Sequence, residues 1–251
     1  MAPPPSLLRC AIAEFVGTLL FQLLGGSATY APFNGVILAI IIFMTAECSG
    51  GVVNPAVATV LLVLGELSSL KWLVYVIIEI LGAVVGAFIA AAADPTAPSL
   101  KAWALDNELG VGCVPNPKFE LTFLCPIFIW EAAGTFMLCA TVLATAVAKP
   151  GFGHLAPMAI GLSVAVNVGS SGHITGGCYN PARFLGPAIV YGCGLHLTWL
   201  YLSAQLFGAL VAALWHAKVT APRARTEDAV TLSGAEMMNS SSTIHLEGAV
   251  Y

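Results

Sequence analysis

The tripeptide Asn-Pro-Ala occurs twice in this chain, as Asn54-Pro55-Ala56 and as Asn180-Pro181-Ala182, and each copy follows a run of small residues. The second copy comes 126 residues after the first, about half of the 251-residue chain. Gly82 and Gly208 keep the same offset in similar apolar surroundings. A repeated spacing of this kind indicates an internal duplication.

A further pair of segments extends the repeat toward the N-terminus. Glu14-Phe15-Val16-Gly17-Thr18 resembles Glu131-Ala132-Ala133-Gly134-Thr135, with an offset of 117 residues. The shorter offset places nine extra residues in the second half, between its Glu and its Asn. The duplication therefore has an insertion in its second copy.

Composition indicates an integral membrane protein. Hydrophobic residues make up 58% of the chain and charged residues only 9%, and the mean hydropathy is +0.89. A soluble domain of this size would be roughly 25% charged. The nine Lys and Arg residues form no basic cluster, so we expect no nucleic-acid partner.

The apolar stretches predict an all-α membrane protein with six transmembrane helices and two re-entrant half-helices. Stretches long enough to span a bilayer lie at about 7–29, 33–48, 70–93, 123–148, 154–172 and 196–217. Two shorter stretches, 54–64 and 180–190, begin at the Asn-Pro-Ala motifs, where Pro in the first turn of a helix is well tolerated.

We expect two repeats, about 7–93 and 123–217, within a channel domain of residues 1–217. Each repeat has three full spans, an odd number, so the second must be inverted relative to the first. The two half-helices then enter from opposite faces and meet near the bilayer midplane, which is typical of a transport site. The polar 218–251 segment predicts a disordered cytosolic tail.

The distribution of Lys and Arg predicts that both termini are cytosolic. The side of the termini holds six of them and the opposite side holds Lys101 and Lys118. The six are Arg9, Lys71, Lys149, Lys218, Arg223 and Arg225. Aromatic residues near span ends suit either a membrane-interface belt or helix packing, namely Trp72, Tyr75, Trp130, Trp199 and Tyr201.

Asn54 and Asn180 are the main candidates for pore chemistry. An Asn at a helix N-cap accepts a backbone N–H with its side-chain oxygen, which leaves its NH₂ group to donate to a passing molecule. Both half-helices also point the positive ends of their dipoles at the meeting point. That field repels cations and orients a central water molecule so that a proton wire is interrupted.

Arg183 follows the second motif, where the first motif has Val57. An Arg within an apolar membrane segment is costly and usually faces a water-filled cavity. We therefore expect a fixed positive charge at a constriction near the outer face. The alternative is a buried Arg paired with a carboxylate, although no acidic residue is nearby in the sequence.

Glu14 and Glu131 occupy matching places in the two repeats. A proton relay is one interpretation, but symmetric duplication favours a structural role, in which each accepts hydrogen bonds from the backbone of a re-entrant loop. Glu79 lies in another span, and Gln205 occupies its matching place, so Glu79 is left without a role, as is Glu47.

The motifs resemble the major intrinsic proteins, the family of aquaporins and glycerol facilitators. The resemblance covers about residues 7–217 and rests on Ala13–Thr18, Ser49-Gly50-Gly51, both Asn-Pro-Ala motifs with Arg183, and Glu131–Thr135. It implies a homotetramer in which each subunit has its own pore. The Gly and Cys residues before Asn180 are more similar to the aquaporin-8 and vacuolar branch.

The resemblance also implies a selectivity filter at Asn34, Val168, Gly177 and Arg183. Water-selective members have Phe, His and a small residue beside the Arg. Asn34 and Val168 are smaller, so a wider filter is expected. Phe184 stands where glycerol facilitators have Asp.

The expected function is a passive channel for water and other small uncharged solutes that excludes protons and ions. The alternatives are a channel mainly for ammonia, hydrogen peroxide, urea or glycerol, or a junctional membrane protein with a vestigial pore. No nucleophile–base pair or metal-ligand spacing indicates an enzyme, a cofactor or a metal. A plasma membrane and an intracellular, vacuolar membrane are both compatible with the sequence.

Overall fold

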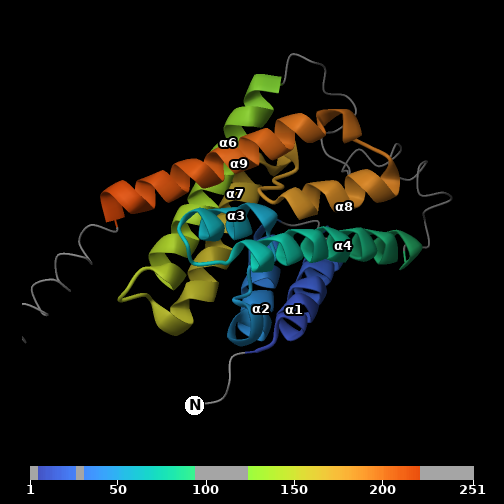
Figure 1. Cartoon of the computed structure of the whole chain (residues 1–251). Coiled ribbons are helices and arrows are strands. Elements are labelled where there is room, and N and C mark those ends of the chain that lie inside the picture. Colours follow the sequence, from blue (N-terminus) through green and yellow to red (C-terminus); the bar gives the residue numbers. More distant parts are fainter. Residues whose placement is uncertain (1–4, 27–30, 94–123, 221–251) are drawn as a thin grey trace, which may run out of the picture.

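The computed structural model describes residues 5–26, 31–93 and 124–220, and the regular structure in these ranges is helical (Figure 1). Six helical segments are long and apolar enough to cross a membrane. In the first repeat they are α1 (Leu7–Leu20) with a π-helical continuation η1 (Phe21–Gly25), α2 (Ala31–Ser49) and α4 (Ser69–Ala93).

The second repeat has the same order of elements. It contains α6 (Leu124–Val142) with its π-helical continuation η3 (Leu143–Val147), α7 (Ala156–Thr175) and α9 (Thr198–Trp215) with its continuation η6 (His216–Thr220). Short 3₁₀ turns precede α7 and α9, η4 (Gly153–Leu155) and η5 (Leu195–Leu197). The predicted spans agree with these helices to within a few residues at their described ends.

Two short helices begin at the repeated motifs, as the sequence predicts. They are α3 (Pro55–Val63) and α8 (Pro181–Tyr191), each with Pro in its first turn. In Figure 1 both lie between α9 and α4, and they also contact each other. At nine and eleven residues and about 1.5 Å per residue, neither is long enough to cross a bilayer.

Close helix contacts repeat in the two halves at the offsets seen in the sequence. A methyl group at Gly82 of α4 would lie 2.6 Å from the carbonyl oxygen of Phe15 in α1. A methyl group at Gly208 of α9 would lie 2.2 Å from the carbonyl oxygen of Ala132 in α6. The missing side chains therefore let α1 pack on α4 and α6 pack on α9 at backbone distance.

The two repeats are joined along α2 and α7, which pack against each other. Gly35 and Gly161, again 126 residues apart, face each other, and a methyl group on either would come within 2.4 Å of the other's carbonyl oxygen. The offset changes from 117 to 126 between Gly134 and Gly161. The insertion therefore falls in the end of α6, η3 and the loop before α7.

Each half-helix packs on the last helix of the opposite repeat, α3 on α9 and α8 on α4. This reciprocal exchange is the arrangement expected of two inverted repeats, which the structure confirms together with the six spans. The lipid-facing surface is apolar, with large side chains such as Leu8, Phe43, Leu162 and Trp199 at least half exposed. That exposure accounts for the high hydrophobic content of the chain.

Two of the aromatic residues near span ends take the packing alternative. Tyr75 and Tyr201 are fully buried, whereas Trp199 is 62% exposed and suits a membrane-interface position. Only the first three residues of the predicted tail, 218–220, are among the described residues. Lys101 and Lys118 lie outside them.

Replacement of Gly208 by Val should destabilise the protein, because the new side chain would collide with the α6 backbone. Overpacking of this kind costs about 1–3 kcal/mol or more. Thermal unfolding in detergent should show a clear fall in Tm, and Gly82→Val should behave alike. Leu214→Val, at a lipid-facing position of α9, is the control, and an equal fall in that variant would contradict the packing argument.

Candidate functional site

Asn54 and Asn180 cap the two half-helices with their side-chain oxygens. Asn54 Oδ1 accepts a hydrogen bond from the backbone N–H of Ala56 at 2.9 Å. Asn180 Oδ1 accepts from Ala182 at 2.9 Å and from Arg183 at 3.3 Å. Both Asn side chains are buried, so the caps fix the amide planes at the point where the half-helices begin.

The amide nitrogens of the same residues connect the two repeats. Asn54 Nδ2 donates to the carbonyl oxygen of Tyr179 at 2.9 Å, and Asn180 Nδ2 donates to that of Val53 at 2.8 Å. The sequence had left both NH₂ groups entirely to the pathway. One hydrogen of each NH₂ group is therefore used across the repeats.

Glu14 and Glu131 lie behind the two loops. Glu14 accepts the backbone N–H groups of Val52 at 3.0 Å and Val53 at 2.6 Å. Glu131 accepts those of Cys178 at 3.1 Å and Tyr179 at 2.8 Å. Each carboxylate therefore satisfies two loop N–H groups that have no helix or sheet partner at this depth.

Two buried tyrosines hold the start of each loop, a role that the sequence reading missed. Tyr75 Oη donates to the carbonyl oxygen of Ser49 at 2.6 Å, and Tyr201 Oη donates to that of Thr175 at 2.8 Å. Tyr201 follows Tyr75 by 126 residues, and Thr175 follows Ser49 by the same offset. A search for tyrosines separated by this offset could have identified the two anchors from the sequence.

The residues before each Asn adopt left-handed backbone conformations. Val53 has φ 42° and Tyr179 has φ 48°, values that are unfavourable for a β-branched or aromatic residue. The ring of Tyr179 fills the space beside Gly134, where a methyl group would come within 2.2 Å of it. Its hydroxyl contacts Ser171 and donates to the carbonyl oxygen of Asn167 at 2.9 Å.

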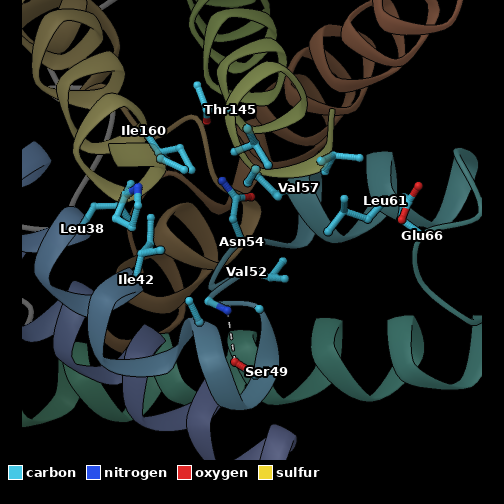
Figure 2. Close-up of a pocket in the computed structure, with 18 of the residues that line it drawn as sticks. Leu38, Ile42, Ser49, Val52, Asn54, Val57, Leu61, Glu66, Thr145 and Ile160 are labelled. Atoms are coloured by element: carbon cyan, nitrogen blue, oxygen red, sulfur yellow. Dashed lines mark hydrogen bonds between the residues drawn. The ribbon is translucent and has the colours of Figure 1, made fainter. Parts of the chain in front are cut away.

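A cavity of about 920 Å³ leads from one face of the molecule to the two Asn side chains. Its mouth includes Pro5, Glu66, Lys71, Lys149 and His154, and Glu47 also lines it. Figure 2 shows Asn54 among the lining residues, with Leu38, Ile42 and Ile160 on one side and Val57 and Leu61 on the other. The walls near the Asn pair are therefore apolar, and polar groups are few.

Arg183 lies in the first turn of α8. Its guanidinium carbon is 5.0 Å from the centre of the Phe21 ring, within the range of a cation–π contact. Its Nη1 is buried and donates no hydrogen bond to an acceptor in the described part of the chain. Phe21 also lines the cavity, so the guanidinium lies next to a residue of the cavity wall.

The other three predicted filter residues are Asn34, Val168 and Gly177: Asn34 lies near Arg183, and Val168 lies near Gly177. A methyl group at Gly25 would lie 3.0 Å from Arg183 Nη1 and 3.1 Å from Asn34 Oδ1, so Asn34 and Arg183 approach the same point. A methyl group at Gly177 would lie 3.1 Å from Val168 Cγ2. Gly25, at the end of η1, was not singled out in the sequence, and a side chain there would require Arg183 and Asn34 to shift by a few tenths of an ångström.

Within residues 5–26, 31–93 and 124–220, no three His, Cys, Asp or Glu side chains group so as to hold a metal ion. The polar groups where the two loops meet include the amides of Asn54 and Asn180 and the carbonyl groups of Val53 and Tyr179.

Comparison with known proteins shows the family. The profile described as "Major intrinsic protein" matches residues 2–216, and the chain belongs to this family of membrane channels.

Curated relatives include Aquaporin TIP1-2 of Zea mays, 35% identical over 231 residues, covering 84% of this chain and 85% of the relative. Aquaporin-8 of Notomys alexis is 31% identical over 219 residues, covering 82% and 80%. The crystal structure of an aquaglyceroporin from Plasmodium falciparum matches with a TM-score of 0.70 and 24% identity, covering 86% of this chain and 98% of that chain. The structural match shows the shared fold.

Replacement of Glu131 by Gln should loosen the second loop. The amide keeps one acceptor oxygen but directs N–H groups at the donors of Cys178 or Tyr179. Loss of a charged hydrogen bond costs about 1.5–3 kcal/mol, and we expect a lower Tm together with lower water permeability in liposomes. Met137→Leu, at an exposed position of the same helix α6 that does not line the cavity, is the control, and equal values for the two variants would contradict the anchoring role.

Proposed function

We propose that this protein is a passive channel for water and other small uncharged solutes. The observation that carries the proposal is the meeting of the two Asn amides at the end of an apolar cavity. Each amide is fixed by a backbone carbonyl of the opposite loop, so its remaining N–H is held in one direction. The relatives named as aquaporins support the same function.

The proposed mechanism separates water from ions by orientation and desolvation. A water molecule between the Asn amides accepts hydrogen bonds from both, so its own hydrogens point away on either side. Apolar walls such as Val57 and Ile160 offer no replacement for the hydration shell of an ion. The positive ends of α3 and α8 add a field that opposes cations and protons.

We propose that Asn34, Val168, Gly177 and Arg183 form the selectivity filter, on the side of the Asn pair away from the cavity mouth. Arg183 supplies a donor that has no protein partner among the described residues. Asn34 and Val168 are smaller than the aromatic groups of a narrow water filter. The proposed consequence is passage of solutes larger than water, among them ammonia, hydrogen peroxide, urea or glycerol.

The protein is a multi-pass membrane protein, and we propose that both termini face the cytosol. Lys71 and Lys149 lie at the cavity mouth together with Pro5 near the N-terminus, which supports a basic inner face. We further propose a homotetramer with one pore per subunit, in a plasma or vacuolar membrane. The relatives are channels, and we propose no enzymatic activity.

Stopped-flow light scattering on proteoliposomes tests the function directly. Osmotic water permeability should exceed that of empty liposomes several-fold, with a low activation energy, since water moves through a pore. Uptake of ammonia, urea, glycerol and hydrogen peroxide, measured on the same vesicles, identifies the cargo. Water permeability equal to that of empty liposomes would leave the main-solute or the junctional alternative.

The double substitution Asn34→Phe with Val168→His tests the filter. Larger rings beside Arg183 should narrow the passage, so solute flux should fall severalfold more than water flux. Val166→Leu, a lipid-facing change on the same helix α7, should leave both fluxes unchanged. An equal loss of water and solute flux in the double variant would argue against the filter assignment.

A further inference from the structure

The anchors behind the two loops differ at one position. Glu79 in α4 and Gln205 in α9 occupy matching places, 126 residues apart, and both are fully buried. The neighbouring anchors Tyr75 and Tyr201 are identical, and so are Glu14 and Glu131. The two repeats therefore share the same anchoring residues except at this position, where the first repeat has a carboxyl group and the second has a neutral amide.

In the second repeat, Gln205 completes the hydrogen bonds of Glu131. Gln205 Nε2 donates to Glu131 Oε2 at 2.9 Å, and the Thr175 hydroxyl donates to Oε1 at 2.6 Å. With the N–H groups of Cys178 and Tyr179, this carboxylate has four donors. An ionised carboxylate has about four acceptor sites, so Glu131 is saturated.

In the first repeat, Glu79 brings a second carboxyl group to the same place. Its neighbours are the carboxyl group of Glu14 and the backbone N–H of Asn54. Neither oxygen of Glu79 accepts a hydrogen bond from a donor in the described part of the chain. An ionised Glu79 would therefore be a buried charge facing a second buried negative charge, an arrangement that is strongly unfavourable.

No Lys or Arg side chain in the described part of the chain is bonded to either carboxyl group of this pair. α1 contributes Arg9, Cys10 and Glu14, of which Arg9 is exposed. α4 itself contributes Lys71 and Tyr75: Lys71 Nζ lies over the Tyr75 ring, 5.2 Å from its centre, and the Tyr75 hydroxyl bonds the carbonyl oxygen of Ser49. α2, which packs on α1, adds Glu47 and Cys48. The other elements packed on α4 are α3 and η1, which have no titratable residue, and α8.

The two titratable residues of α8 are directed elsewhere. Arg183 lies over Phe21, and Tyr191 Oη lies 3.3 Å from the carbonyl oxygen of Ala87, two turns of α4 beyond Glu79. Neither supplies a counter-charge to the carboxyl pair.

We propose that Glu14 and Glu79 hold one proton between them, so that Glu79 donates to Glu14 as Gln205 donates to Glu131. A protonated carboxyl group has one O–H donor, which replaces the amide donor of the second repeat. Glu14 then keeps the negative charge that holds the N–H groups of Val52 and Val53. Such a pair titrates as a unit.

The proposal makes the first loop sensitive to alkaline pH and leaves the second loop insensitive. Removal of the shared proton would place two carboxylates side by side behind Val52, Val53 and Asn54, whereas the Gln205 amide has no proton to lose. The stabilising effect of the shared proton is therefore present at low pH and is lost once the pH is high enough to remove it. The inference rests on the fold and not on the proposed cargo.

Infrared spectroscopy of the wild-type protein and Glu79→Gln in liposomes tests the shared proton. At neutral pH the wild type should show the C=O stretch of a protonated carboxylic acid, shifted in D₂O, and the variant should lack it. Gln205→Glu is the matched control, because it builds the same pair in the second repeat and should add a second such band. Identical carboxylic-acid bands in the wild type and Glu79→Gln would overturn the proposal.

Thermal unfolding across a pH series provides a second test that does not require the infrared assignment. The Tm of the wild type should fall by about 5 °C or more at alkaline pH relative to Glu79→Gln, and Gln205→Glu should fall further. Water permeability should follow the same order. Parallel pH curves for all three proteins would contradict a shared proton, and if Glu79→Gln fails to fold, the comparison of wild type with Gln205→Glu still decides.

Discussion

The structure depends on the need to satisfy backbone polar groups in the middle of a membrane. Between α2 and α3, and again between α7 and α8, the chain has no helical hydrogen bonds, and no water replaces them in a bilayer. Side chains supply the partners instead. Glu14 and Glu131 accept hydrogen bonds from the N–H groups of the loops. The hydroxyls of Tyr75 and Tyr201 donate to the first carbonyl group of each loop. The amides of Asn54 and Asn180 donate to the last carbonyl group of the opposite loop.

Neither loop can satisfy all of its backbone carbonyl groups alone, because the last carbonyl of each accepts a hydrogen bond from the Asn amide of the other. Asn54 belongs to the first loop but satisfies Tyr179, and Asn180 belongs to the second but satisfies Val53. Val53 and Tyr179 are also held at positive φ, a strain of about 1–3 kcal/mol each. This backbone conformation directs the carbonyl groups of Val53 and Tyr179 at the Asn amide of the opposite loop. The orientation of the pore donors is therefore a property of the assembled pair of repeats.

The sequence predicted the architecture well, because inversion follows from an odd number of spans and from two Asn-Pro motifs at equal offset. It did not predict what the Asn amides do across the repeats, since a hydrogen bond between residues 125 apart leaves no local pattern. Tyr75 and Tyr201 were open between a belt and a packing role because hydropathy gives their depth and not their direction. Gly25 was missed because a glycine near a helix end is common.

The positions where the two halves differ explain how a symmetric scaffold carries an asymmetric pathway. Val57 and Arg183 occupy matching places, yet Val57 lines the cavity and Arg183 lies over the ring of Phe21. On the proposed function, a solute crossing the channel meets a hydrophobic passage in one half and a cationic donor in the other. The carboxylates that hold the loops lie behind them, and the carboxylates that line the cavity, Glu47 and Glu66, are exposed. Cations are then repelled by the field, and anions are opposed by the apolar half, where no donors replace their water.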